Sequence, residues 1–219
     1  MDIKKHALND TDKKIKYQHI INTAEKLLNS GDFHQITMAR LAEQSGLAKG
    51  TLFLYFQTKE DVFLSLAEQK IKQWSQTLSG RMKKAAGEKN QIQMNELIDI
   101  LIESVQNKVF IKLFSILDDT LVQNIDYKRA YKFKLFFKDI MIEVGRGIEA
   151  VLPIIRKGDG ISLLNHFFIC LIGAYKTTAG SPVMDQVIRQ PGLEMFKRDF
   201  VKTLKENITY HMIGFLTIN

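Results

Sequence analysis

The sequence is poor in cysteine and proline, with one and three residues of these types among its 219. The single cysteine, Cys170, excludes an internal disulfide and a metal cluster built from several thiolates. So few prolines leave room for long helices, because proline interrupts a helix interior. The longest stretch without a charge, 160–175, is shorter than the roughly 20 apolar residues of a membrane span. We therefore expect no membrane partner.

The sequence also lacks a secretory signal and the usual signatures of catalysis. No apolar stretch follows the lysines near the N-terminus, which favours a soluble, cytoplasmic protein. The segment 145–147, Gly-Arg-Gly, lacks the third glycine and the preceding strand of a dinucleotide loop. No two histidines stand at the i, i+3 or i, i+4 spacing that suits a metal; they are His6, His19, His34, His166 and His211. We therefore expect no enzyme and no metal or other cofactor.

What the sequence does contain is an excess of positive charge, +7 overall. A basic chain suits an anionic partner such as nucleic acid, although many basic proteins bind none. The segment 44–59 is more informative than the total, because it holds two lysines and no acidic residue.

Apolar residues recur at helical spacing along the chain, and no segment shows the alternation of a strand. The pattern predicts an all-α protein. A three-helix unit over residues 1–58 is followed by a larger helical domain over 59–219. The expected helices cover 12–30, 37–46, 49–56, 58–80, 91–106, 109–124, 127–152, 160–179 and 194–216. We expect the segments 153–160 and 180–192 to be breaks.

The second and third expected helices form a candidate helix-turn-helix. Gly46 ends the helix expected over 37–46 at little energetic cost, because glycine adopts the left-handed conformation without a side-chain clash. Ala42 is small enough for a helix crossing, and apolar residues join the pair to the first helix: Leu41, Leu47, Leu52 and Phe56. Thr51 and Tyr55 share the outer face, which must stay free for DNA. A plain helical hairpin is the alternative.

At this point the sequence resembles the N-terminal DNA-binding domain of the TetR/AcrR transcriptional regulators, over about residues 16–66. The anchors are Ala24, Gly31, Phe33, Thr37, Leu41, Ala42, Gly46, Lys49, Gly50, Thr51, Leu52, Tyr55, Phe56, Lys59 and Glu60. The resemblance implies a homodimer. In each subunit the second helix of the helix-turn-helix enters a major groove, and the two grooves are adjacent. The resemblance also implies a ligand pocket in the larger domain.

The resemblance further implies roles in DNA binding for individual residues. Thr37, at a helix start, holds a phosphate through its hydroxyl and nearby amides. Lys49 and Thr51 reach base edges or phosphates. Gly50 lets the backbone approach the DNA closely, and the hydroxyl of Tyr55 contacts a phosphate or a base.

The remaining residues expected near DNA include one more lysine and positions where this sequence differs from the family pattern. Lys59 pairs with a phosphate. The family often has tyrosine at Phe53 and serine at Ala48, so each of these positions lacks one hydroxyl contact. Leu54 touches a thymine methyl, or it packs on the dimer partner's arm or is simply exposed. Arg40 either contacts a phosphate or lies in solvent.

The larger domain is rich in phenylalanine, which predicts either an apolar effector pocket or an ordinary core. The candidate lining residues are Trp74, Phe114, Phe137, Met141, His166, Phe167 and Cys170. His166 is either a hydrogen-bonded core histidine or the group that orients a polar end of the ligand. Asp118 and Asp119 either attract a cationic ligand or form a solvated helix end.

The last two expected long helices, 160–179 and 194–216, are apolar on more than one side. In the final helix one face carries Phe196, Phe200, Leu204, Ile208 and Met212, while Tyr210, Ile213 and Phe215 lie off it. A helix with two apolar sides must bury both. We expect these helices to form a four-helix interface with a second copy, which places two recognition helices about 34–36 Å apart on a palindromic operator.

These patterns favour a ligand-responsive regulator, a repressor that an apolar or amphipathic effector releases from DNA. One alternative is a DNA-binding protein of the same fold without a small-molecule effector, controlled by a protein partner or acting architecturally. It predicts a larger domain without an internal cavity. The other alternative is an all-α enzyme, which needs polar groups converging in a cleft.

Overall fold

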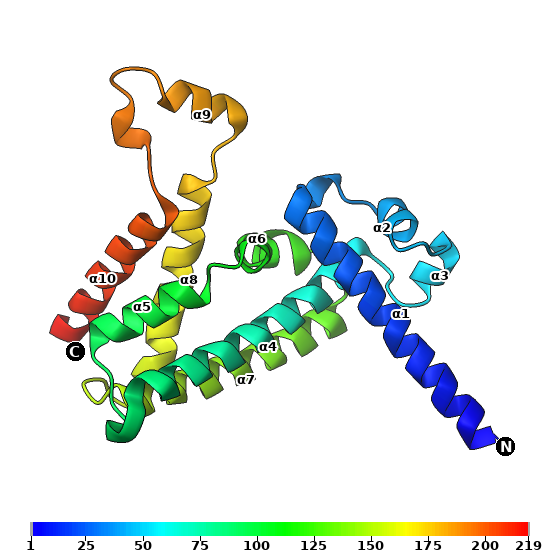
Figure 1. The fold of residues 1–219 in the computed structure, drawn as a ribbon, viewed down its shortest axis with the longest axis horizontal. Helices are drawn as coiled ribbons and strands as arrows, with labels where there is room; N and C mark the ends of the chain where they lie inside the picture. The colour runs from blue at the N-terminus through cyan, green and yellow to red at the C-terminus, as the bar shows by residue number, and fades with distance from the viewer. Residues whose placement is uncertain (1, 219) are drawn as a thin grey trace. The chain divides into compact units, whose positions relative to one another are not determined.

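The computed structural model describes the backbone of residues 2–218 and the side chains of residues 10–217 except 89, 118, 119 and 182. Within these ranges the chain is helical and contains no strand, so the prediction of an all-α fold is confirmed (Figure 1). The side chains of Asp118 and Asp119, considered above as a cation site, lie outside the described residues.

The chain forms two compact units, one of residues 1–70 with 108–133 and one of residues 71–107 with 134–219. Two long helices, α4 (Lys59–Ala86) and α7 (Tyr127–Val151), each contribute residues to both units. The expected domain boundary after residue 58 stays a prediction, and each unit is described by itself below.

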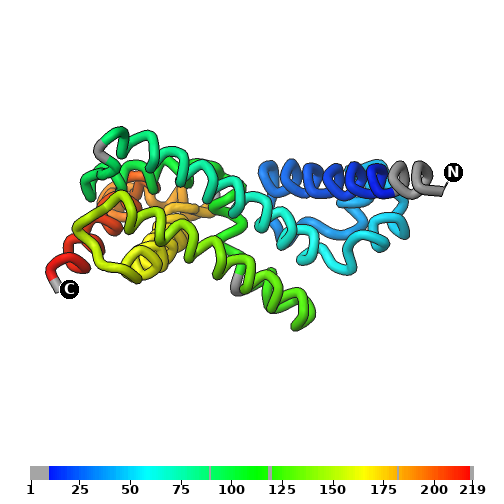
Figure 2. Tube along the Cα trace, turned by 90° about the horizontal axis from the view of Figure 1, so that it is seen from below, coloured from blue at the N-terminus to red at the C-terminus, as the bar shows by residue number. Residues whose placement is uncertain are grey.

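Unit 1 is built on α1, which spans Asp2–Ser30 and begins earlier than expected. No glycine or proline precedes Gly31, so nothing in the sequence stops the helix sooner. The other elements of the unit are η1 (Phe33–Gln35), α2 (Met38–Gln44), α3 (Lys49–Phe53), α6 (Lys108–Ile116) and the π-helical turn η3 (Leu117–Leu121). Figure 2 shows α1 as a straight helix beside α2 and α3.

The core of unit 1 contains the apolar stripe of α1, the short helices and the start of α4. Its fully buried members include Ile20, Ile21, Ala24, Leu28, Leu41, Leu52, Val62 and Phe63. Burial of one such side chain stabilises a fold by about 1.5–3 kcal/mol for the larger residues. The turn between α2 and α3 has Gly46 at φ 62°, as the sequence predicts, and Leu47 behind it is half-buried. The packing thus fixes α3 on the surface of the unit.

Hydrogen bonds at helix ends complete unit 1. The hydroxyl of Thr37 accepts from Arg40 N–H at 3.2 Å, so the predicted cap of α2 is confirmed. Thr58 accepts from Asp61 N–H at 3.1 Å in the same way at the start of α4. Lys112 on α6 donates to the carbonyl of Leu28 at 2.8 Å, which satisfies the C-terminal end of α1. These contacts hold the helix ends in place.

An arginine on α7 ties unit 1 together further. Arg129 donates to Glu68 at 2.6 Å and 2.9 Å and to Ser65 at 3.2 Å. Burial alone lowers the pKa of Arg129, but the hydrogen bond to Glu68 and the charges of Glu68 and Asp61 outweigh it and raise the pKa. The guanidinium therefore stays charged and bidentate, which favours a fixed position of Arg129 beside the first turns of α4.

Unit 2 contains the rest of α4 and α7 with η2 (Gly87–Lys89), α5 (Met94–Ser104), α8 (Asp159–Thr178), α9 (Pro182–Ile188), η4 (Glu194–Phe196) and α10 (Phe200–Ile218). α10 lies against α8 and α5 (Figure 1). α7 and α8 approach closely where a Cβ on Gly145 would lie 2.9 Å from Ile161 Cγ1.

Two expectations for unit 2 were wrong. The supposed break at 180–192 contains α9, which Ser181 caps by accepting from Met184 N–H at 3.2 Å, with Pro182 in the first turn. The last helix begins at Phe200 rather than near residue 194, since 194–196 form the separate turn η4. Phe196 is therefore exposed and off the helix, whereas Leu204, Ile208 and Met212 form its buried face.

Candidate functional site

The outer surface of α3 and of the turn after it presents the residues that the sequence predicts to face DNA. The expected helix over 49–56 ends at Phe53, so Leu54 and Tyr55 lie in that turn. Leu52, on the inner side, is fully buried and anchors the helix. Lys49 and Gly50 are exposed, Thr51 and Tyr55 are half-buried, and Leu54 is 84% exposed. None of these positions is enclosed in the core, so the arrangement leaves α3 open to a macromolecular surface.

The start of α2 and the turn before α3 supply the flanks of this surface. Thr37 and Arg40 are both exposed, and the Thr37 hydroxyl accepts from its helix while its own proton stays available to an acceptor. Ala48 is exposed and precedes α3 without a side-chain hydrogen bond to the helix. The expected contacts of these residues with phosphate stay predictions.

The two lysines of the motif have different surroundings. Lys49 Nζ lies 5.9 Å from the centre of the Phe53 ring on the surface of α3. Lys59 Nζ donates to the carbonyl of Phe33 at 3.2 Å and lies 4.3 Å from the centre of the Phe33 ring. An ammonium has three donors, so Lys59 combines this structural contact with capacity for a further acceptor. Lys59 therefore contributes to the fold as well as to the charge of this surface.

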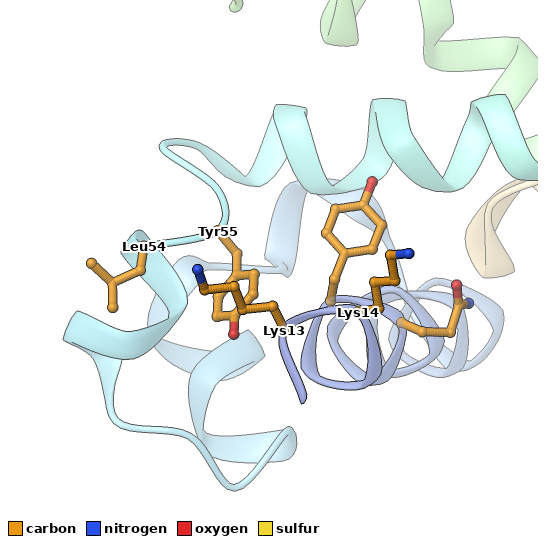
Figure 3. A pocket seen from close by; sticks show the side chains of 6 residues that line it. Lys13, Lys14, Leu54 and Tyr55 are labelled. Atoms are coloured by element: carbon orange, nitrogen blue, oxygen red, sulfur yellow. The ribbon is translucent and has the colours of Figure 1, made fainter. Parts of the chain in front are cut away.

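Sequence reasoning missed a groove of about 620 Å³ between α1 and the end of α3 (Figure 3). We call it the α1–α3 groove, and its lining residues are Lys13, Lys14, Tyr17, Gln18, Leu54 and Tyr55. The only signal in the sequence was a pair of lysines ahead of the apolar stripe of α1. A helical repeat alone does not say which other element those lysines face.

In unit 2 the structure brings three of the predicted effector-lining residues together around a fourth ring. The ring centres of Trp74, Phe137 and Phe167 lie 5.3, 6.0 and 5.5 Å from that of Phe168. Trp74 Nε1–H donates to Ser104 Oγ at 2.9 Å, which satisfies its polar atom. Helices α4, α7 and α8 thus share an aromatic cluster, and Phe168, which was not among the candidates, lies at its centre.

The other candidates are distributed more widely. Met141 and Cys170 are buried in unit 2, and burial raises the pKa of the Cys170 thiol. His166 is half-buried on α8, and its Nδ1 lies 3.4 Å from Nδ1 of His211 on α10. Sequence spacing alone could not reveal this pair.

Phe114 is the one candidate that belongs to unit 1. Its ring is buried against Phe110 on the same helix, with the ring centres 4.8 Å apart. That all seven residues line one effector pocket stays a prediction.

Exposed apolar residues mark the outer sides of α8 and α10, where we expect a second copy to bind. Ile169 is 67% exposed on α8, and Tyr210 and Ile213 are 71% and 58% exposed on α10. Neighbouring residues on both helices are fully buried, so each helix has one covered and one uncovered apolar side.

Two kinds of feature are absent from the described part of the chain, a metal site and a membrane-spanning helix. This part of the chain contains no group of three or more histidine, cysteine or acidic side chains arranged to hold a metal ion. None of its helices combines the length and the apolar character that a bilayer span demands.

Comparison with known families decides the identity of the fold. The family model for the tetracyclin repressor-like C-terminal domain matches residues 68–219, and that for bacterial regulatory proteins of the tetR family matches residues 20–66. The chain belongs to the TetR family. Its membership identifies it as a transcriptional regulator and agrees with the resemblance seen over the motif. In this TetR-family chain α2 and α3 form the helix-turn-helix.

Individual relatives agree with this assignment. The fatty acid metabolism regulator protein of Bacillus subtilis is 34% identical over 80 residues, which cover 36% of this chain and 41% of that protein. The chain spans only part of the length of its curated relatives. The matched segment covers between 24% and 55% of a relative's length, depending on the relative.

Solved structures share the fold of this TetR-family chain at low identity. A transcriptional regulator from Rhodococcus has a TM-score of 0.58 at 12% identity, with 90% of this chain and 96% of that chain covered. The transcriptional regulator FadR of Bacillus subtilis, solved in complex with stearoyl-CoA, has a TM-score of 0.53 at 19% identity, with 88% and 96% covered.

Proposed function

We propose that this TetR-family chain is a homodimeric, ligand-responsive transcriptional repressor that binds a palindromic operator. The observation that carries the proposal is the open outer surface of α3 on a buried anchor, with Thr51 and Tyr55 accessible and Leu52 enclosed. A helix held in this way enters a major groove without rearrangement of its own unit.

The accessible side chains of α3 and of the turn after it have different roles in recognition. Lys49 binds phosphate or the acceptors on guanine, and Thr51 and Tyr55 present hydroxyls to bases or phosphates. Leu54 is so exposed that it suits contact with a thymine methyl. Thr37 and Arg40 at the start of α2 bind phosphate and fix the register, since phosphate contacts position a protein without reading sequence.

The dimer forms through the uncovered apolar sides of α8 and α10. Ile169, Tyr210 and Ile213 are the exposed residues that a second copy would cover. A twofold axis at this interface pairs the two α3 helices, and a palindromic operator mirrors that symmetry.

The effector is a long-chain acyl compound, most simply an acyl-CoA thioester. One relative is named a fatty acid metabolism regulator, and one similar structure holds stearoyl-CoA. The aromatic cluster of Trp74, Phe137 and Phe168 in unit 2 supplies an apolar surface suited to an acyl chain. The acyl compound releases DNA only if it binds the DNA-incompetent state better than the competent one.

A mobility-shift titration tests both parts of the proposal. The probe is a duplex from the DNA upstream of the chain's own coding region, with unlabelled nonspecific DNA as competitor and palmitoyl-CoA as the added effector. We expect a shifted band that survives competitor and fades with palmitoyl-CoA but not with free CoA. A probe that stays unshifted at low salt overturns DNA binding. A band that palmitoyl-CoA leaves unchanged overturns the effector assignment and favours control by a protein partner.

A further inference from the structure

The α1–α3 groove lies partly outside the segment that the family model matches. That match begins at residue 20, whereas four of the six lining residues precede it: Lys13, Lys14, Tyr17 and Gln18. The α1 side of the groove thus precedes the matched segment and is not part of the helix-turn-helix.

The groove carries positive charge without a compensating partner. Lys13 and Lys14 are exposed, and no acidic residue lines the groove. Asp10 and Asp12 lie on the same helix, but among the described residues neither lysine has a carboxylate within ion-pair distance. Two uncompensated ammonium groups beside a concave surface attract an anion.

The floor of the groove is held in place by contacts within unit 1. The Tyr17 ring stacks on Phe56, with ring centres 5.1 Å apart and planes 29° apart. Gln18 donates to Asn22 at 2.9 Å and exchanges hydrogen bonds with Gln69 at 3.0 and 3.2 Å. Both side chains are therefore fixed before anything binds, which lowers the entropy cost of filling the groove.

The opposite wall of the groove belongs to the surface already proposed to face DNA. Figure 3 shows Leu54 and Tyr55 extending from the end of α3, with Lys13 and Lys14 on α1. All these residues belong to one unit, so their arrangement does not depend on the rest of the chain. Tyr55 thus belongs both to this groove and to the surface proposed to face DNA, which places the two lysines next to that surface.

We propose that the α1–α3 groove holds the sugar-phosphate backbone of DNA beside the recognised half-site, with Lys13 and Lys14 as its phosphate ligands. This inference rests on the proposed function and extends the DNA footprint beyond the helix-turn-helix. Because phosphates are the same in every sequence, these lysines add affinity and leave base preference unchanged.

The test compares the double variant Lys13→Ala/Lys14→Ala with the control Lys83→Ala/Lys84→Ala. The control removes two adjacent exposed lysines from the part of α4 that belongs to unit 2, and it causes the same change in net charge. Binding of a fluorescein-labelled 40-base-pair duplex, selected on the unaltered protein, is followed by anisotropy at several salt concentrations. A scrambled duplex of equal length measures nonspecific binding, and circular dichroism checks that both variants fold.

In a dimer the groove variant loses four lysines, so the slope of log affinity against log salt should become shallower by about 3 to 4. Affinity at 0.1 M salt should fall at least about tenfold for both the selected and the scrambled duplex, while the control keeps the slope of the unaltered protein. An unchanged slope, or an equal change in the control, overturns the phosphate site while DNA binding stands. Absence of binding by the unaltered protein overturns the proposed function itself.

Discussion

Gly50 shows how a single residue separates folding from DNA binding. A Cβ added at Gly50 meets no atom within 4 Å, and the residue lies inside α3 with an ordinary helical backbone. Gly50→Ala should therefore stabilise the free protein by about 0.5–1 kcal/mol, because alanine is the better helix former. It should also weaken operator binding, because the added methyl group keeps the backbone from the DNA.

Thermal unfolding and anisotropy titration of the Gly50→Ala variant measure these two effects separately. A variant that gains stability and binds operator as tightly as the unaltered protein would contradict the close approach of α3 to DNA. Gly80→Ala is a suitable control, because Gly80 also has open space around it but lies in the later part of α4, away from α3 in sequence.

The buried thiol of Cys170 predicts a pH effect on stability. Burial raises the pKa of Cys170, so the folded state holds this proton more tightly than the unfolded state does. This contribution is complete below about 8.5, the ordinary pKa of a thiol, and is lost as the pH rises above it. Urea unfolding between pH 7.5 and 9.5 should show a steeper loss of stability in the unaltered protein than in Cys170→Ala. Parallel pH profiles would show that the thiol ionises freely in the fold.

At the scale of elements, the crossing of α7 and α8 depends on two glycines. A Cβ on Gly160 would collide with the carbonyl oxygen of Gly145, and a Cβ on Gly145 would lie 3.0 Å from Ile161 N. Gly160→Ala should therefore lower the free energy of unfolding by about 1–3 kcal/mol, because backbone atoms must move apart. Denaturant unfolding measures the loss, and a variant as stable as the unaltered protein would show that the two helices cross less closely.

Helices with a repeating apolar stripe could be predicted from the sequence. Helices without such a stripe could not. The starts of α2 and α4 follow from Thr37 and Thr58, whose caps the structure contains. α9 was missed because Val183, Met184 and Val187 are exposed, so the helix has no buried stripe that shows in the sequence. Its one local signal was the Ser181–Pro182 pair, a cap followed by a proline.

The site divides in the same way. The outer face of α3 follows from the spacing of Leu52 and Phe56, which must point inward. The approach of Lys13 and Lys14 to Tyr55 depends instead on how α1 crosses α3 in space. The cluster of Trp74 and Phe137 around Phe168 likewise joins three helices distant in sequence. Helical periodicity assigns residues to faces, but only packing decides which faces meet.

At the scale of the whole molecule, the proposed function requires a dimer for operator binding. Ile213 is 58% exposed on α10, on the side expected to meet a second copy. Ile213→Glu should give a monomer with operator affinity at least about a hundredfold weaker, because a charge buried at an interface costs several kcal/mol. Met195→Glu, at a residue 77% exposed on η4, is the control and should stay dimeric. Light scattering after size exclusion gives the mass, and a dimeric Ile213→Glu variant would exclude this interface.

The most direct test of the account is in vitro selection of duplex DNA from a random pool by the unaltered protein. Paired α3 helices predict two enriched half-sites in inverted orientation, with centres about 34–36 Å apart along the duplex. The same selection with Thr51→Ala should change the preferred bases and keep the spacing, because the dimer sets the spacing and α3 reads the bases. Failure to enrich any sequence, or enrichment that Thr51→Ala leaves unaltered, would contradict the claim that α3 is the recognition helix.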